Sequence, residues 1–179
     1  KEIDYCGNSI YQAAKESCAD GVQMIIKVDS RSSLILAQKD GRIVMTRTIP
    51  YGVIQDEQGS MEEAEQSMVA LVEGVSKVVD YYNSGHRGEA VERICITGVG
   101  ANYVGLCDML EEEIHVPARV LSNITGINTE KVFKGNSFSE YTACIGAALA
   151  PIHFASDKEE DKSAASKGGV DPLRLTAII

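Results

Sequence analysis

The stretch that decides the fold is Ile96-Thr97-Gly98-Val99-Gly100-Ala101-Asn102-Tyr103-Val104-Gly105-Leu106. It overlaps the apolar run 93–97, which is typical of a buried strand, and its glycines predict a turn that leads into a helix carrying Tyr103 to Ile114. Glycines there let the backbone approach a ligand closely, and a helix N-terminus favours anions. A tight strand-to-helix turn that binds nothing would need the same glycines. The spacing alone leaves both interpretations open.

Apolar runs and turn signals around this stretch predict an α/β fold. Asp40-Gly41 between two apolar runs is typical of a tight hairpin turn, so the first three strands should form an antiparallel meander. The order βββαβαβα predicts a mixed five-stranded sheet flanked by helices, as in one half of an actin-like or ribonuclease-H-like fold. Periodicity alone is also compatible with other α/β folds. The predicted strands are 23–28, 33–38, 42–49, 93–97 and 118–122.

Capping boxes and apolar periodicity locate the helices. Ser60-x-x-Glu63 predicts the start of a long helix with one apolar face, which ends at 83–85. A second box, Ser137-x-x-Glu140, precedes a helix at 140–150 whose small residues would let it pack very close to a sheet. Another helix is expected at 9–19.

Charge and cysteine content argue against several function classes. Lys and Arg total 17 against 26 Asp and Glu, a net charge of −9. This balance argues against nucleic acid as the main partner and against simple electrostatic docking on an anionic membrane. The five cysteines form no CxxC pair, which is typical of free thiols in a reducing, cytoplasmic setting. The sequence contains no signal-peptide pattern and no apolar run long enough to span a bilayer.

The stretch 96–106 resembles the adenine-side motif of PilM-type pilus assembly proteins and their FtsA relatives, members of the actin-like ATPase superfamily. That motif reads roughly leucine, Ser or Thr, three glycines, alanine, two apolar residues, proline, glycine, leucine. Val99, Asn102 and Val104 depart from it. The resemblance covers about residues 8–152 and implies the C-terminal half of an actin-like protein. Further matches are Val28-Asp29 with Ser30 to Ser33, Arg47-x-Ile49-x-x-Gly52, Glu63-Ala64-Glu65 and the helix 143–149.

The resemblance implies a degenerate nucleotide site with no catalytic and no metal-ligating residue. Arg31 stands where the phosphate turn normally has glycine, and its side chain is disfavoured at positive φ, although its charge could contact phosphate from the side. Val99 places a branched side chain where adenine would lie. Asp29 is interpreted as a turn-capping residue that accepts amide hydrogen bonds from 31–33 or, alternatively, as a metal-linked carboxylate. We expect no cofactor here, and ATP with Mg²⁺ only in a full-length protein. The candidate nucleotide-binding residues are Asp29, Ser30, Ser32, Ser33, Gly98, Gly100 and Ala101.

The resemblance and the composition together predict four parts of the chain. Residues 1–22 are expected to be the remnant of a preceding subdomain with a hinge helix, because the chain starts without Met inside a predicted helix. Residues 23–155 would form the actin-like subdomain with a reduced insertion, and 156–169 a flexible linker. The apolar tail 170–179 would dock on a sheet edge or groove, in cis or by self-association, or else begin an omitted segment.

The function implied by the resemblance is a cytoplasmic scaffold for type IV pilus assembly, or fimbrium biogenesis. Such a protein would bind a segment of a PilN-like inner-membrane partner, reach the inner face of the membrane through it, and couple it to other pilus machinery, including the assembly motor. The alternative is a partial view of an active actin-superfamily ATPase or small-molecule kinase. A division protein of the FtsA type ranks third, because the tail is too short for an amphipathic membrane-targeting helix.

Overall fold

A computed structural model describes residues 5–18, 21–53, 61–124, 127 and 138–149 of the 179-residue chain. Chain contacts define two compact units, and all of the described residues lie in the unit Tyr5–Ala150. The predicted linker 156–169 and the predicted apolar tail 170–179 lie outside the described residues, as do residues 1–4 of the expected remnant.

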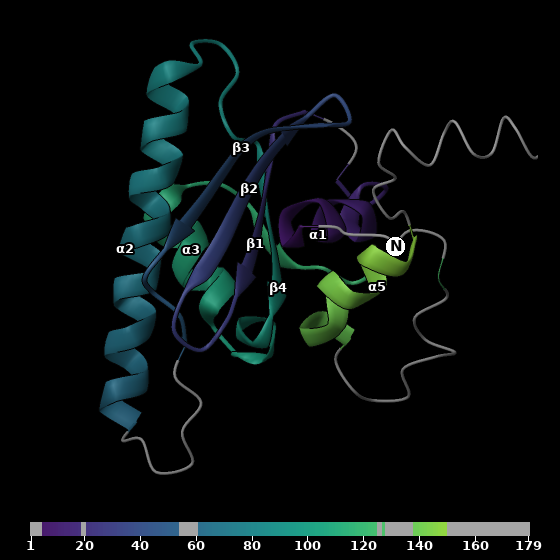
Figure 1. The fold of residues 1–179 in the computed structure, drawn as a ribbon. Coiled ribbons are helices and arrows are strands. Elements are labelled where there is room, and N and C mark those ends of the chain that lie inside the picture. The colour runs from purple at the N-terminus through teal and green to yellow at the C-terminus, as the bar shows by residue number, and fades with distance from the viewer. Residues whose placement is uncertain (1–4, 19–20, 54–60, 125–126, 128–137, 150–179) are drawn as a thin grey trace, which may run out of the picture. The chain divides into compact units, whose positions relative to one another are not determined.

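Five strands form one mixed sheet in the order β3-β2-β1-β4-β5 (Figure 1). The first three strands pair antiparallel, whereas β4 runs parallel to β1 and β5 runs parallel to β4. Asp40 and Gly41 have φ values of 48° and 73°, as a two-residue hairpin turn between right-twisted strands requires. The predicted fold class is therefore confirmed. The strands are β1 Gln23–Val28, β2 Ser33–Lys39, β3 Arg42–Ile49, β4 Arg93–Gly98 and β5 Ala118–Val120.

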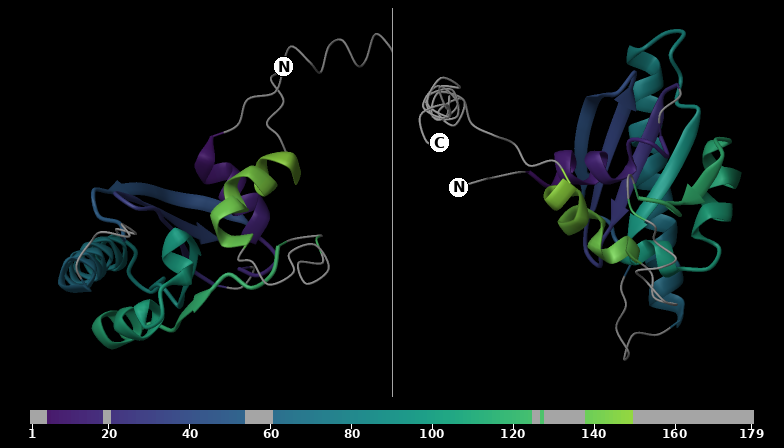
Figure 2. Two further views of the ribbon diagram at one scale, coloured as in Figure 1. Left: turned by 90° about the horizontal axis from the view of Figure 1, so that it is seen from below. Right: turned by 90° about the vertical axis from the view of Figure 1, so that its right-hand side faces the viewer.

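Helices cover both faces of the sheet. The long helix α2 (Met61–Gly85) and α3 (Leu106–Ile114) lie on one face, and α1 (Cys6–Ala14) and α5 (Thr142–Leu149) lie side by side on the other (Figures 1 and 2). Two short 3-10 turns, η1 (Val99–Asn102) and η2 (Phe138–Tyr141), connect these elements.

Alternating side chains of β1 fill two separate cores. Met24, Ile26 and Val28 belong to the larger core under α2 and α3, whereas Ile25 belongs to a smaller core under α1. Because successive side chains of a strand point to opposite faces, a strand covered on both sides must be apolar throughout. This explains why Met24, Ile25, Ile26 and Val28 of β1 are all apolar.

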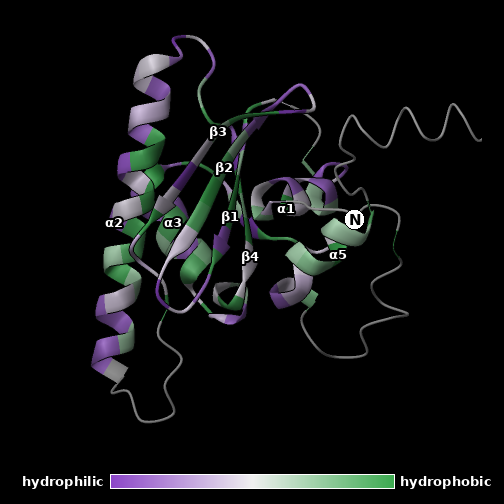
Figure 3. Cartoon of the chain, viewed as in Figure 1, coloured by the Kyte–Doolittle hydropathy of each residue, from purple (hydrophilic) through white to green (hydrophobic). Residues whose placement is uncertain are grey.

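α2 turns one apolar face toward the sheet, as the periodicity predicts. Leu71, Val75, Val79 and Tyr82 are buried in the larger core. Polar and charged residues alternate with the apolar ones along the helix, which gives the alternating colours of α2 in Figure 3. Ser60, the first residue of the predicted capping box, lies outside the described residues.

α5 packs against a helix rather than against the sheet, which corrects the prediction. A Cβ atom at Gly146 would lie 1.7 Å from the carbonyl oxygen of Ser9 in α1, so the two helix backbones nearly touch. The turn before α5 is tied to β4 instead. The buried hydroxyl of Thr97 donates to the carbonyl of Ser139 at 3.0 Å and lies 2.6 Å from the hydroxyl of Thr142.

Three predicted boundaries were also wrong. The first helix begins at Cys6 and ends at Ala14, followed by a turn, instead of spanning 9–19. The last helix begins at Thr142, because the residues from Phe138 to Tyr141 form η2. β5 ends at Val120, although the N–H of Leu121 still donates to the carbonyl of Ile96 at 2.8 Å.

Candidate functional site

The two predicted nucleotide turns leave the sheet at the same edge. Val28 ends β1 and is paired with Gly98 at the end of the parallel strand β4. The turn after β1 and the 3-10 turn after β4 therefore begin side by side, because parallel strands present their carboxyl ends at one edge. This edge carries Asp29, Ser30 and Ser32 from one turn and Gly98, Gly100 and Ala101 from the other.

The glycines of the second turn are required by packing within the chain. Gly98 has a φ of 83°, and a Cβ atom there would lie 2.4 Å from the carbonyl oxygen of Val28. A Cβ atom at Gly100 would lie 2.4 Å from a methyl carbon of the same valine. A side chain would collide with β1 at either position, so the ligand-free interpretation of this motif accounts for both glycines.

The helix after the glycine turn starts later than predicted. Gly98 leads into η1, and α3 begins only at Leu106, after Gly105 in a left-handed conformation with φ 91°. Tyr103 therefore lies between the two elements, not in the helix. A helix attracts anions only around its first turn. The first turn of α3 begins at Leu106, so Gly98 and Gly100 do not lie at the N-terminus of that helix.

Asp29 makes contacts other than the predicted amide cap. Its carboxylate pairs with the ammonium group of Lys27, its N–H donates to the carbonyl of Ser32 at 3.1 Å, and its own carbonyl accepts from Val53 at 3.0 Å. The side chain of Asp29 is 45% exposed. The carboxylate is thus paired with a cation from the end of β1, two residues before it.

The side chain of Ser33 makes a hydrogen bond within the fold. It is buried, and its hydroxyl donates to the carbonyl of Tyr51 at 2.8 Å. Gly52, which follows, has no room for a side chain, because a Cβ atom would lie 2.2 Å from the carbonyl oxygen of Asp29. The segment after β3 therefore packs against the turn after β1 through backbone contacts.

Ser30 and Arg31 are the exposed members of the first turn. They line a cavity of about 230 Å³ whose other walls come from Pro50, Tyr51 and α2. The glycine turn does not line this cavity. The structure thus brings the two turns to one edge, and the cavity beside Ser30 and Arg31 is lined by residues other than those of the glycine turn.

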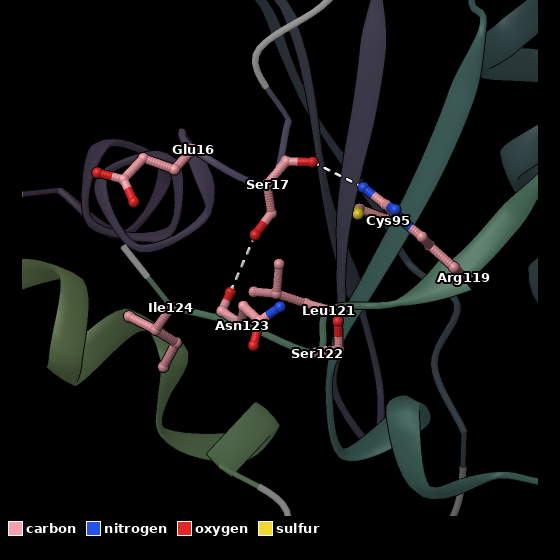
Figure 4. A pocket seen from close by; sticks show the side chains of 8 residues that line it. All are labelled: Glu16, Ser17, Cys95, Arg119, Leu121, Ser122, Asn123 and Ile124. Carbon is pink, nitrogen blue, oxygen red and sulfur yellow. Dashed lines mark hydrogen bonds between the residues drawn. The ribbon is translucent and has the colours of Figure 1, made fainter. Parts of the chain in front are cut away.

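A second site lies on the α1 face, and the sequence did not predict it. A cavity of about 320 Å³ is lined by Cys95 of β4 and Arg119 of β5, among others (Figure 4). Arg119 Nη2 donates to the carbonyl of Ser17 at 2.7 Å, and the hydroxyl of Ser17 donates to the carbonyl of Asn123 at 3.2 Å. Cys95 lies in the apolar run 93–97 and is buried. Only the tertiary arrangement places Arg119 beside it.

Two general features complete the description of the site. In the described part of the chain, no three His, Cys, Asp or Glu side chains come together in a way that could hold a metal ion. Nor does any helix in these residues combine the length and apolarity needed to cross a bilayer.

Comparison with known proteins gives the fold. The sequence matches no known family profile and no curated protein. Among solved structures, a PilM–PilN type IV pilus biogenesis complex has a TM-score of 0.57 and 14% identity over 80% of this chain. MreB5 of Spiroplasma citri bound to AMPPNP has a TM-score of 0.56 and 9% identity over 91% of this chain. The chain has the actin-like fold.

The chain corresponds to only part of these neighbours. It spans 50% of the PilM–PilN chain and 61% of the MreB5 chain. A third neighbour, the ethanolamine utilization protein EutJ from Carboxydothermus hydrogenoformans, has a TM-score of 0.50 and 13% identity, and 53% of it is covered. Identities this low establish the actin-like fold and nothing finer.

Proposed function

We propose that this chain is part of a cytoplasmic scaffold in a type IV pilus assembly complex. It would hold a cytoplasmic segment of a PilN-like inner-membrane protein, stay at the inner face of the membrane through that partner, and couple it to the assembly motor. Two findings support this proposal: the fold similarity to the PilM of a PilM–PilN complex, and the contacts at the edge where β1 and β4 end.

The observation that carries the proposal is the packing of the glycine turn. Gly98 and Gly100 lie against Val28, so the space that a Cβ atom would need is filled by β1. Glycines that serve a nucleotide instead leave backbone open toward the ligand. Asp29 is paired with Lys27 and Ser33 with the Tyr51 carbonyl, which leaves few polar groups at this edge free to bind phosphate. Recognition of a protein segment fits this edge better than phosphate chemistry.

A second candidate is nucleotide binding by a longer actin-superfamily ATPase or small-molecule kinase. One observation favours it: the two turns meet at the same edge, and Ser30 and Arg31 are exposed there. An arginine and a serine hydroxyl on an exposed turn can contact phosphate oxygens. We rank this candidate second because Arg31 lines a cavity on the α2 side of the turn, away from the glycine turn.

One pair of measurements separates the two candidates. The 179-residue chain, and any longer protein that contains it, would be titrated with a labelled peptide from the cytoplasmic segment of a single-span membrane protein encoded beside it. Fluorescence anisotropy should give a Kd near 1 μM, about −8.2 kcal/mol, with no binding of a scrambled peptide. The same samples would be melted with and without Mg-ATP.

The outcomes are distinct. A ligand at one hundred times its Kd stabilises the native state by about 2.7 kcal/mol, so bound ATP would raise the melting temperature by several degrees. Peptide binding with an unchanged melting temperature supports the scaffold. A raised melting temperature without peptide binding would reverse the ranking.

A further inference from the structure

A groove lies between α2 and α3, the two helices that cover the larger core. The helices lie side by side there (Figure 2), and the groove contains a cavity of about 310 Å³. Three apolar and three acidic residues line this cavity: Val69, Val72, Met109, Glu73, Glu112 and Glu113. None of them belongs to the turns after β1 and β4, so the groove is separate from the candidate site described above.

The apolar residues of the groove leave surface open to solvent. Val69 is 45% exposed, and Met109 is half-buried at the border of the larger core. Val72, one turn along α2 from Val69, is buried and closes the cavity on the core side. A partner that covered Val69 and Met109 would remove this apolar surface from water, which favours binding.

The two helices that form the groove are acidic and lack basic residues beside it. Residues 61–76 and 106–114 contain four acidic residues each and no Lys or Arg. Lys77 follows the first segment and lies 3.9 Å from Glu73, but both side chains are highly exposed, and such an ion pair contributes little. The charge around the groove is therefore strongly negative.

Glu112 and Glu113 stand at positions that the fold does not favour. They belong to the last turn of α3, which contains no basic residue, and a helix C-terminus disfavours negative charge. Their neighbour Glu111 accepts a hydrogen bond from the N–H of Ala118 at 2.7 Å. Glu112 and Glu113 have no hydrogen-bond or ion-pair partner among the residues that the structure describes. A cation from outside the chain would relieve this repulsion.

The chemistry of the groove selects the kind of occupant. Nucleic acid and anionic lipid carry the same sign of charge as its rim, and a second copy of this chain would bring a net charge of −9. A metal ion does not fit, because no three ligating side chains come together in the described part of the chain. A basic protein segment supplies both requirements, apolar side chains for the cavity and Lys or Arg for the rim.

We propose that the groove between α2 and α3 binds a basic amphipathic segment of a partner protein. One or two apolar side chains enter the cavity, and Lys or Arg side chains pair with Glu112 and Glu113. The cavity is at the small end of ligand pockets, so it holds anchoring side chains and the rest of the segment lies across the helices. This docking surface does not depend on the proposed scaffold role.

The test uses a fluorescein-labelled peptide of leucine and lysine, with leucines at positions i, i+3, i+4 and i+7. It would be titrated into the 179-residue chain and followed by fluorescence anisotropy. We expect a micromolar Kd that rises at high salt, because exposed charges are screened. A peptide of the same composition with scrambled leucines should bind about tenfold more weakly, because it cannot present one apolar face.

A matched pair of double variants tests the rim. Glu112→Gln/Glu113→Gln should weaken binding about fivefold, as the loss of two exposed ion pairs would. Its melting temperature should stay the same or rise, since the two charges oppose the helix dipole. The control Asp40→Asn/Glu92→Gln makes the same change of charge at exposed positions outside the groove and should bind like the unmodified chain.

A matched pair of valines tests the apolar part. Val69→Ser should weaken binding about tenfold. The control is Val44→Ser on β3, which is equally exposed at 46% and should leave the Kd unchanged. The proposal is wrong if the peptide does not bind, if the scrambled peptide binds equally well, or if a control variant weakens binding as much as its groove counterpart. It is also wrong if sedimentation shows dimers that Val69→Ser dissociates, because a second copy would then occupy the groove.

Discussion

The contact between α1 and α5 leaves no space for even one methyl group, and Gly146→Ala tests it. The added Cβ atom would lie 1.7 Å from the carbonyl oxygen of Ser9 and 2.5 Å from its carbonyl carbon. Ordinary contacts of this kind begin near 3.4 Å, so the helices must move apart by about 1.7 Å along that line. Both atoms of Ser9 belong to the backbone, so no change of rotamer can relieve the clash.

Two opposing terms set the magnitude. Overpacking costs about 1–3 kcal/mol, and the upper end applies here because the obstacle is backbone. Alanine is better than glycine in a helix interior by about 1 kcal/mol, which offsets part of the cost. We therefore expect Gly146→Ala to lower the free energy of unfolding by about 2 kcal/mol. For a domain of this size the melting temperature should fall by about 4–8 °C.

The measurement is urea and thermal unfolding followed by circular dichroism, because the chain has no tryptophan to report by fluorescence. The matched control is Gly85→Ala at the end of α2, where a Cβ atom would meet nothing within 4 Å. The control should be neutral or stabilising by up to about 1 kcal/mol. If Gly146→Ala is as stable as the unmodified chain, the close crossing of α1 and α5 is wrong.

Three further substitutions test other contacts. Thr97→Val removes the buried hydroxyl that donates to η2, and it should lower the free energy of unfolding in urea by about 1–3 kcal/mol. The control is Thr46→Val on the exposed edge strand β3, which should change that free energy by less than about 0.5 kcal/mol. The buried hydroxyl of Tyr82 has no hydrogen-bond partner among the residues that the structure describes. Tyr82→Phe should therefore be as stable as the unmodified chain or more stable in urea unfolding, and a marked loss of stability would contradict this. Lys39 donates a hydrogen bond to Glu89 at 2.6 Å, which lowers the pKa of Glu89. The stability that this pair contributes is therefore fully present above the ordinary carboxyl pKa of 4.5, and it is lost as the pH falls through the lowered pKa. An NMR titration should place the Glu89 midpoint below 4.5 and return it to its ordinary value in Lys39→Gln; unchanged titration in that variant would contradict the ion pair.

The sheet could be predicted from the sequence because its signals are local. The run 23–28 predicts a strand and Asp40-Gly41 predicts a hairpin turn, and the structure contains both. The apolar face of α2 follows from the 3.6-residue period alone. Each of these features depends on residues that are neighbours in the chain.

The site could not be predicted to the same depth, because its contacts are tertiary. The glycines at 98 and 100 suit either a ligand or a close neighbour, and only the register of β4 on β1 shows that the neighbour is Val28. The late start of α3 depends on the left-handed conformation of Gly105, which a helical pattern of apolar residues does not reveal. Cys18 and Cys95 lie in one buried cluster, although they belong to segments that are far apart in the sequence.

The face that carries α1 is held more rigidly than its small core suggests, because α1 and the turn after it are fixed at two places. Near its start, Ser9 touches the backbone of Gly146 in α5. Beyond its end, the carbonyl of Ser17 accepts a hydrogen bond from Arg119 at 2.7 Å, directly before Cys18. These contacts fix the segment from α1 to the turn after it against α5 at one end and against β5 at the other. The same face is tied to the sheet at a third place, because Thr97 of β4 is hydrogen-bonded to Ser139 of η2 and Thr142 of α5.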